Sequence, residues 1–174
     1  MKVLTIKQPW ASLIILGYKR FEFRSWQTKY RGDLLIHAGL GVDKEAMTRL
    51  AKYLPEELPK GEIIGKVKLV DCIKMSPEFK ELLLNENSEI YKNSVFKENY
   101  GWQMTDVQKF DKPIKAKGHL SLWEYDLNWK IIMNKEEILK KVLEHFWIHN
   151  FCREHKKSNL KIKKYYKIRR EKCT

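Results

Sequence analysis

The first 26 residues alternate short apolar runs with polar breaks, and this pattern predicts two strands joined by a short helix. Residues 3–7 have the two-residue period of a strand. Pro9 suits the first turn of a helix, where no amide hydrogen bond is lost, and Gly17 is expected to end that helix. Over residues 21–26 the side chains alternate again, which predicts a second strand with one packed face.

The next apolar runs predict a buried strand, a helix and a long strand. Residues 34–38 are almost entirely apolar and are expected to form a short core strand. Asp43 has the side chain of a helix N-cap, and the helix is expected to continue to about Leu54. A loop over residues 55–61 then leads to a strand over residues 62–73.

The following fifty residues predict one more helix and two more strands. Ser-Pro-Glu at 76–78 begins a helix, whereas residues 85–99 are polar and are assigned to a loop with helical turns. Residues 100–106 and 118–124 have strand patterns and are separated by a loop that contains Pro113. Strands with helices mainly between the early ones predict a mixed α+β fold, with a small mixed or closed sheet flanked by helices.

The pattern changes after Tyr125. Residues 135–153 carry apolar side chains at helical spacing, which predicts an amphipathic helix. Residues 152–174 hold ten Lys/Arg and two Glu, which predicts a basic tail. We therefore divide the chain into a folded domain over 1–127 and a helical, basic extension over 128–174.

Composition agrees with one domain plus an extension, and charge points to a polyanionic partner. The chain has 174 residues, of which 43% are hydrophobic, and a formal net charge of +13. Residues 128–174 contain 14 Lys/Arg and 5 Glu, so most of the excess charge lies in the extension. Many cations attract phosphates, so we expect RNA or a nucleotide as partner, with DNA second and an anionic membrane surface behind both.

Cysteine usage and the absence of a long apolar run favour a soluble protein of the cytoplasm. Cys72, Cys152 and Cys173 are odd in number and far apart, so a disulfide framework is not expected. The longest apolar run, over residues 11–16, is too short to cross a bilayer. We expect a monomer in the cytoplasm, without a membrane segment or a cofactor.

A metal site in the extension is an alternative that we do not favour. His145, His149 and Cys152 fall at i, i+4 and i+7 on the predicted helix, a spacing that can offer zinc ligands. No second cysteine lies near these three residues along the chain, since the next one is Cys173. We interpret these residues as the border of the apolar stripe and expect no metal.

Residues 17–24, G-Y-K-R-F-E-F-R, place four charges among three aromatic rings directly after a glycine. Glu22, Arg24 and Trp26 are expected on one face of the predicted strand, with Lys19 just before it. This set can orient a planar polar ligand, such as a base, by arginine bonding, carboxylate acceptance and stacking. The alternative is a charged network that seals one end of the fold. Buried charges are costly, so we favour the ligand site.

The same residues carry a family resemblance. Gly17, Lys19, Glu22 and Arg24 form the pattern G-x-K-x-x-E-x-R. It is preceded by I-K-Q-P-W-A-S-L-I and followed by S-W-Q-T-K-Y-R-G-D-L-L-I-H-A, Y-G-W-Q-M-T-D and P-I-K-A-K-G-H-L-S-L-W-E. In these motifs, over residues 3–125, the chain resembles the ASCH family. The resemblance implies a small PUA-like β-barrel flanked by helices, with a polar cleft and a link to RNA or nucleotide-like ligands.

The resemblance also implies an enzymatic alternative. Some small bacterial members of the family are similar to amide hydrolases of N4-acetylcytidine, which use the signature lysine, a threonine three residues later and a distant glutamate. Lys19 matches the lysine, but Glu22 stands at the threonine position. Glu22 favours the charged form of the lysine, whereas a lysine base or nucleophile must be neutral. Binding is therefore favoured. A ribonuclease that uses the same cleft is the other enzymatic alternative, and in an enzyme of either kind Lys19 and Glu22 would be the catalytic residues. For the distant glutamate of the amide hydrolase, Glu62, Glu78 and Glu81 are candidates by rough position.

Three more residues are candidates for the cleft. Trp10 either forms a wall of the cleft or belongs to a helix cap with a buried indole. Arg31, in the loop after the signature strand, either contacts a backbone phosphate or lies in a solvated turn. His37 ends a predicted core strand, where a hydrogen bond to the fold is favoured over catalysis.

The basic tail favours nucleic-acid binding without reference to any family. Each lysine or arginine that contacts a phosphate releases bound counterions, which gives affinity that falls steeply with salt. The expected phosphate contacts are Lys161, Lys163, Lys164, Lys167, Arg169 and Arg170. A tail that only maintains solubility is the alternative. A third class, a protein-interaction adaptor that uses the helix around Leu143 and Trp147, has no specific motif in its favour.

Overall fold

The computed structural model describes residues 1–92 and 99–127. The chain divides into two units, Met1–Tyr125 and Asp126–Thr174, and the described residues lie almost wholly in the first. The amphipathic helix and the basic tail predicted beyond residue 128 lie outside the described residues.

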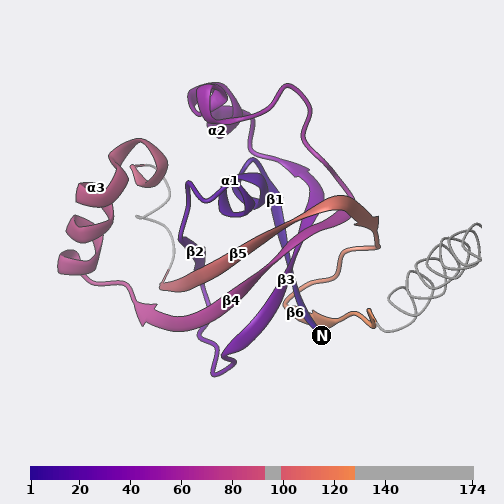
Figure 1. Ribbon diagram of the computed structural model, residues 1–174. Coiled ribbons are helices and arrows are strands. Elements are labelled where there is room, and N and C mark those ends of the chain that lie inside the picture. The colour runs from indigo at the N-terminus through magenta and orange to yellow at the C-terminus, as the bar shows by residue number, and fades with distance from the viewer. Residues whose placement is uncertain (93–98, 128–174) are drawn as a thin grey trace, which may run out of the picture. The chain divides into compact units, whose positions relative to one another are not determined.

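Six strands form one mixed sheet in the order β2-β5-β4-β3-β1-β6 (Figure 1). Neighbouring strands are antiparallel except β1 and β3, which are parallel. The strands are β1 (Lys2–Gln8), β2 (Phe21–Arg24), β3 (Gly32–Val42), β4 (Glu62–Lys74), β5 (Tyr100–Lys115) and β6 (Leu122–Glu124). The helices are α1 (Trp10–Ile15), α2 (Lys44–Arg49) and α3 (Pro77–Tyr91), with a 3₁₀ turn η1 (Ala51–Tyr53) after α2.

The sheet is curled but open. β2 and β6 are its edge strands, and in the part of the chain that the structure describes no strand pairing joins β2 to β1 or to β6. The mixed α+β fold predicted from the sequence is therefore confirmed, whereas closure into a barrel is not. β2 is short, and its four residues pair with β5 on one side only.

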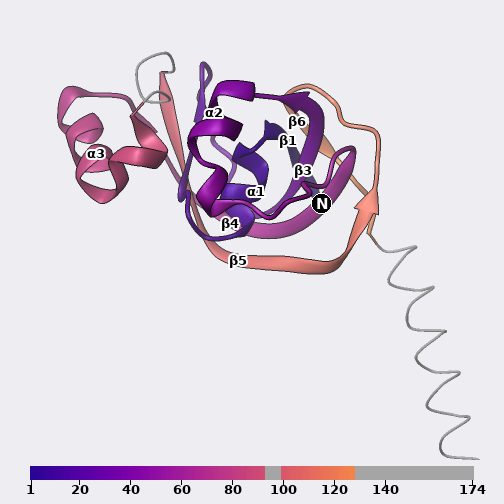
Figure 2. The ribbon, with the colours of Figure 1, turned by 90° about the horizontal axis from the view of Figure 1, so that it is seen from above.

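Helix α1 lies inside the curl of the sheet and supplies much of the core (Figure 2). All six of its residues are buried, as expected for a helix that is apolar on every side. The fully buried side chain of Gln8 satisfies its first turn, because Oε1 accepts a hydrogen bond from the Ser12 amide at 3.1 Å. Nε2 of Gln8 donates to the oxygen of Pro59 at 2.7 Å and ties the helix start to the loop before β4.

A second, smaller apolar layer lies on the other face of β1 and β3. Val3 and Leu35 are fully buried but lie outside the main core cluster. The chain after β5 runs along this face, and we call residues 116–125 the strap. Trp123 of the strap is the strand partner of Val3 and donates through Nε1 to Thr5 Oγ1 at 3.0 Å.

Two predicted helices have different ends in the structure. Asp43 is the N-cap predicted, since its Oδ1 accepts from the Ala46 amide at 3.1 Å, but α2 ends at Arg49 and is followed by the 3₁₀ turn. The segment over residues 85–99, predicted as a loop with helical turns, is helical in its first half, because α3 continues to Tyr91. It does so across a kink at Asn87, whose Oδ1 accepts from the Ile90 amide at 3.1 Å and caps a new turn.

Two predicted strands also differ. β5 passes through Pro113, which was assigned to a loop, and ends at Lys115. Proline is tolerated there because it falls within the irregularity between the Gly65–Lys109 and Ile63–Ile114 pairs, where the ladder is interrupted. The last strand is shorter than the predicted 118–124, since β6 contains only Leu122–Glu124 and Ser121 has a φ of 59°.

Substitution of Gly65 tests how closely β4 approaches β5 and α1. A Cβ atom at Gly65 would lie 2.5 Å from the main-chain oxygen of Gln108 and 2.8 Å from Cδ1 of Ile15. We expect Gly65→Ala to lower the free energy of unfolding by about 1–3 kcal/mol in urea denaturation, because the strands must separate. Gly41→Ala is the control, since its nearest contact is an ordinary 3.6 Å to Cβ of Lys7. Equal losses in the two variants would contradict this packing.

Candidate functional site

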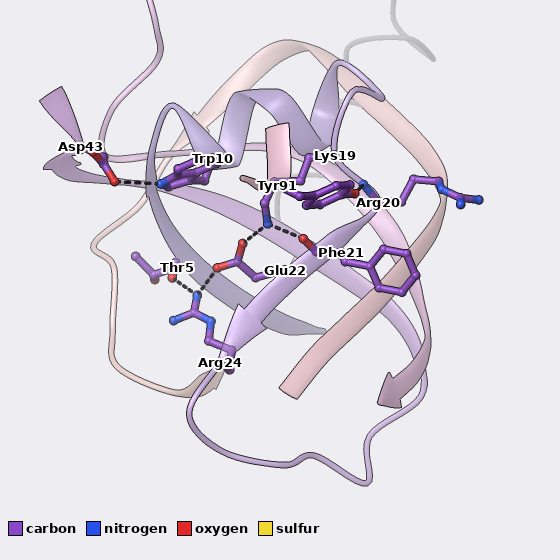
Figure 3. A network of polar contacts seen from close by, with 9 residues as sticks. All are labelled: Thr5, Trp10, Lys19, Arg20, Phe21, Glu22, Arg24, Asp43 and Tyr91. Atoms are coloured by element: carbon purple, nitrogen blue, oxygen red, sulfur yellow. Dashed lines mark hydrogen bonds and ion pairs between the residues drawn. The ribbon is translucent and has the colours of Figure 1, made fainter. Parts of the chain in front are cut away.

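Three charged side chains meet in the gap between β1 and β2 (Figure 3). Nζ of Lys19 lies 2.8 Å from Oε2 of Glu22, and Nη2 of Arg24 lies 3.4 Å from Oε1 of the same carboxylate. One carboxylate therefore bridges two cations. We call Lys19, Glu22 and Arg24 the charged cluster. The structure thus brings together the three charged residues that the sequence singles out.

The cluster occupies a place where the sheet lacks a strand. β6 pairs with β1 at Lys2, Val3 and Leu4, so Thr5 lies just past the end of that pairing. Nη2 of Arg24 donates to the main-chain oxygen of Thr5 at 2.8 Å and so joins β2 to β1. Nζ of Lys19 donates to the main-chain oxygen of Phe21. Side-chain cations therefore bond to the main chain of both strands that border the gap.

Lys19 is the deepest charge in the site. Its side chain is 1% exposed, and burial lowers the pKa of Lys19 below the usual lysine value, while the attraction and hydrogen bond of Glu22 oppose that change. The ring centroids of Phe23 and Trp10 lie 4.8 Å and 5.7 Å from Nζ, and aromatic faces attract cations. The amine is thus surrounded by a carboxylate, a carbonyl and two rings.

Arg24 is the accessible member of the cluster. Its side chain is 25% exposed, against 10% for Glu22. Nε of Arg24 has no hydrogen-bond partner among the described residues, although the atom is buried. An unpaired buried donor is costly, and an acceptor atom of a ligand would satisfy it. The site can therefore offer a cationic donor beside a carboxylate to a planar polar group.

Trp10 forms part of the wall around Lys19, and its indole is also anchored. The residue is 8% exposed, and Nε1 donates to Oδ2 of Asp43 at 3.2 Å. Asp43 therefore has two roles, because the same carboxylate caps α2. Nearby, the side chain of Gln8 accepts a hydrogen bond from the amide of Ser12 in the first turn of α1.

Trp26 and Arg31 lie in the loop after β2. The placement of Trp26 on the strand was wrong, because β2 ends at Arg24, and its ring instead packs edge-on against Trp102 with a centroid distance of 4.6 Å. Nη2 of Arg31 lies 2.9 Å from Oδ1 of Asp71. Nη1 donates to the main-chain oxygens of Thr28 and Tyr30 in its own loop. Arg31 thus stabilises the loop in this structure.

His37 lies under the strap, on the face of β3 that also carries Leu35. It is 1% exposed, and Nε2 lies 3.0 Å from the main-chain oxygen of Ala116. Gly118 packs so closely that a Cβ there would be 2.7 Å from Cε1 of the ring. Burial lowers the pKa of His37 below the usual histidine value. His37 is thus held by the strap rather than by the charged cluster.

Two contributors to the site have no signal in the sequence. Thr5 acts through its main-chain oxygen, so its residue type does not reveal the role. Tyr91 lies in the segment assigned to a loop, yet its hydroxyl accepts from the Arg20 amide at 3.0 Å and its ring packs on Phe23 at 5.8 Å. The end of α3 therefore helps to place the strand that carries the cluster.

The remaining predicted contacts and site types concern other parts of the chain. The six tail residues predicted to contact phosphate lie outside the described residues. Over residues 1–92 and 99–127, no group of three or more His, Cys, Asp or Glu side chains is placed to hold a metal. In the same ranges, no helix has the length and apolar character needed to cross a membrane.

Comparison with known proteins identifies the family. The model of the ASCH domain family matches residues 4–114, which include the whole charged cluster. The chain belongs to the ASCH domain family. The match ends one residue before the end of β5, so the strap is additional to it.

Relatives of this ASCH chain include much longer proteins. Activating signal cointegrator 1 of Homo sapiens and that of Mus musculus are each 35% identical to it over 134 residues. The alignment covers 71% of this chain and 22% of each relative, so the chain spans about a fifth of their length. Among solved structures, the crystal structure of ASCH from Zymomonas mobilis is 17% identical, with a TM-score of 0.48. The structural match covers 81% of this chain and 92% of the Zymomonas mobilis chain.

A double-mutant cycle measures the ion pair inside the ASCH domain. We expect Lys19→Met or Glu22→Gln alone to lower the free energy of unfolding by about 3–5 kcal/mol, because each leaves a buried partner uncompensated. The double variant should lose less than the sum of the two single losses. Urea denaturation at one pH gives the coupling energy.

The matched control for this cycle is the surface pair of Lys2 and Glu124. Both pairs have an N–O distance of 2.8 Å, but the surface side chains are 37% and 74% exposed. Lys2→Met and Glu124→Gln should therefore couple by less than about 1 kcal/mol. A coupling between Lys19 and Glu22 as small as that would show that the buried pair does not hold the gap.

The buried His37 should make the domain lose stability in mild acid. In the unfolded chain His37 binds a proton with a pKa of about 6.5, whereas in the folded chain its pKa is lower. The free energy of unfolding therefore falls as the pH drops below about 6.5. We expect wild type to lose about 1 kcal/mol more than His37→Gln between pH 7.5 and pH 5.5. Urea denaturation at both pH values measures the difference. His119→Gln changes an exposed histidine and should keep most of the wild-type slope, because repulsion from His119 contributes least to the lowered pKa of His37. A wild-type pH slope in His37→Gln would contradict the effect.

Proposed function

We propose that this ASCH chain binds single-stranded RNA. In this proposal, the polar edge of one nucleotide is received at Arg24 and Glu22, and the basic extension over residues 128–174 supplies attraction that does not depend on sequence. Single-stranded DNA offers similar bases and phosphates, and we rank it second.

The unpaired Nε of Arg24 beside the Glu22 carboxylate carries the proposal. Oε2 of Glu22 takes the hydrogen bond from Lys19 at 2.8 Å, whereas Oε1 is 3.4 Å from Arg24, longer than a good charged hydrogen bond. The carboxylate of Glu22 and the guanidinium of Arg24, the more exposed of the two side chains, therefore keep hydrogen-bonding capacity for a ligand. A base edge carries donors and acceptors side by side, which suits a carboxylate next to a guanidinium.

The cluster also has a structural part, and the two roles fall on different members. Lys19 is buried and holds Glu22 in place, so it contributes to the fold. Arg24 spans the gap with one nitrogen and leaves another donor unused. The network predicted as an alternative to a ligand site is thus compatible with binding at its exposed end.

Hydrolysis by Lys19 is less well supported than binding. Burial lowers the pKa of Lys19, as an amine nucleophile or base requires. The side chain is only 1% exposed, however, and Nζ already donates to Phe21 and Glu22. A substrate would have to displace these partners before it reached the amine. The same obstacle applies to a ribonuclease that uses this lysine.

Fluorescence anisotropy with a labelled, mixed-sequence single-stranded RNA tests the proposal on the full chain. We expect Arg24→Lys to weaken binding about tenfold, because a lysine offers no planar fork of donors. Replacement of all six predicted tail residues by glutamine should reduce the slope of log affinity against log salt, by about 0.7 for each phosphate that is no longer neutralised.

The controls separate the site from charge alone. The control for the tail variant has six exposed lysines of the folded domain replaced by glutamine, so its charge changes by the same amount as in the tail variant. These lysines are Lys44, Lys60, Lys109, Lys112, Lys115 and Lys117. The proposal is wrong if wild type shows no salt-sensitive RNA binding, if Arg24→Lys binds RNA as tightly as wild type, or if the tail variant and this control lose affinity equally. Release of acetate from N4-acetylcytidine, or shortening of the RNA, with loss of either in Lys19→Met, would favour the enzymatic alternative instead.

A further inference from the structure

An aromatic ring projects from the turn between α1 and β2, next to the charged cluster in sequence. Tyr18 is 45% exposed, although its main chain is held firmly. Its amide donates to the main-chain oxygen of Leu13 at 2.9 Å, and the Gly17 amide donates to that of Ile14 at 3.0 Å. Gly17 has a φ of 81°, which lets the chain leave the helix in this direction. The ring is therefore presented to solvent from a fixed backbone.

A second ring supports it from η1. The centroids of Tyr18 and Tyr53 lie 5.0 Å apart, at 56°. The hydroxyl of Tyr53 donates to the carboxylate of Glu89, and Nζ of Lys52 lies 5.1 Å from the Tyr53 ring. Residues from three separate segments thus hold this pair of rings. We call Tyr18, Tyr53 and Lys52 the tyrosine platform.

Three cations lie within or close to the tyrosine platform in sequence and are paired to different degrees. Arg20 forms two hydrogen bonds with the Glu86 carboxylate, at 2.9 and 2.6 Å, and Lys52 pairs with Glu89 at 2.7 Å. Arg49 instead donates to the main-chain oxygen of Glu89, and its buried Nε has no partner among the described residues. In the described part of the chain, Arg49 is therefore held by a main-chain oxygen and not by a carboxylate.

We infer that the tyrosine platform stacks one unpaired base of bound single-stranded RNA on the ring of Tyr18, an inference that rests on the proposed function. Each base has a flat π face, so an exposed ring offers stacking without sequence preference. The backbone of Tyr18 is already ordered, so little freedom is lost on binding. Arg49, which bonds to a main-chain oxygen and not to a carboxylate, is the cation that can attract the phosphate accompanying the base. The platform adds a point of RNA binding outside the charged cluster.

Two substitutions of Tyr18 test stacking against simple apolar contact. We expect Tyr18→Leu to weaken RNA binding about 5- to 100-fold in fluorescence anisotropy, because the π face is removed. Tyr18→Phe keeps the ring and should bind within about twofold of wild type. Leu40→Ala, which removes another exposed apolar side chain, should have no effect. Irradiation of wild type with an RNA containing 4-thiouridine should give an adduct on the peptide that contains Tyr18.

The outcomes separate this inference from the proposed function. If wild type binds RNA with a steep salt dependence but Tyr18→Leu binds equally well, stacking on the platform is wrong and the proposed function stands. If wild type binds no RNA, both are wrong. Equal weakening in Tyr18→Leu and Tyr18→Phe would show that the hydroxyl, not the ring face, touches the RNA, and would overturn the inference.

Discussion

A peptide carbonyl that leaves water on folding needs a hydrogen-bond donor, and in a sheet the next strand normally supplies it. At the gap between β1 and β2 the donors are side-chain cations, since Arg24 bonds to Thr5 and Lys19 bonds to Phe21. The carboxylate of Glu22 holds both cations and offsets the cost of taking them out of water. The open side of the sheet depends on this one ionic bridge.

This arrangement explains how a buried ion pair and a binding site can share one segment. Lys19 and Glu22 are buried because they complete the fold, whereas the side chain of Arg24 is partly exposed and its buried Nε has no partner among the described residues. Lysine and glutamate therefore constrain the position of the arginine. Under the proposed function, the protein orders the site during folding, so an RNA strand meets a guanidinium that is already oriented.

The sequence predicted the mixed fold and the proximity of the cluster, because both follow from local patterns. Alternation around Phe21 and Phe23 placed the strand, and the spacing of Lys19, Glu22 and Arg24 brought their head groups together. Sheet closure and the path of α3 were not accessible, because they depend on long-range pairing. No local pattern shows that Tyr91 contacts Arg20, or that Trp26 leaves the strand to pack on Trp102.

The strap has a consequence for where the autonomous folding unit ends. Residues 116–125 lie beyond the family match, yet Trp123 is the strand partner of Val3. Its indole donates to the side-chain oxygen of Thr5, and the main-chain oxygen of the same residue accepts a hydrogen bond from Arg24. A fragment cut at the family boundary would uncover the apolar face of β1 and β3 and release a neighbour of the ionic bridge. For this chain the minimal domain is therefore longer than the region that the ASCH family model matches.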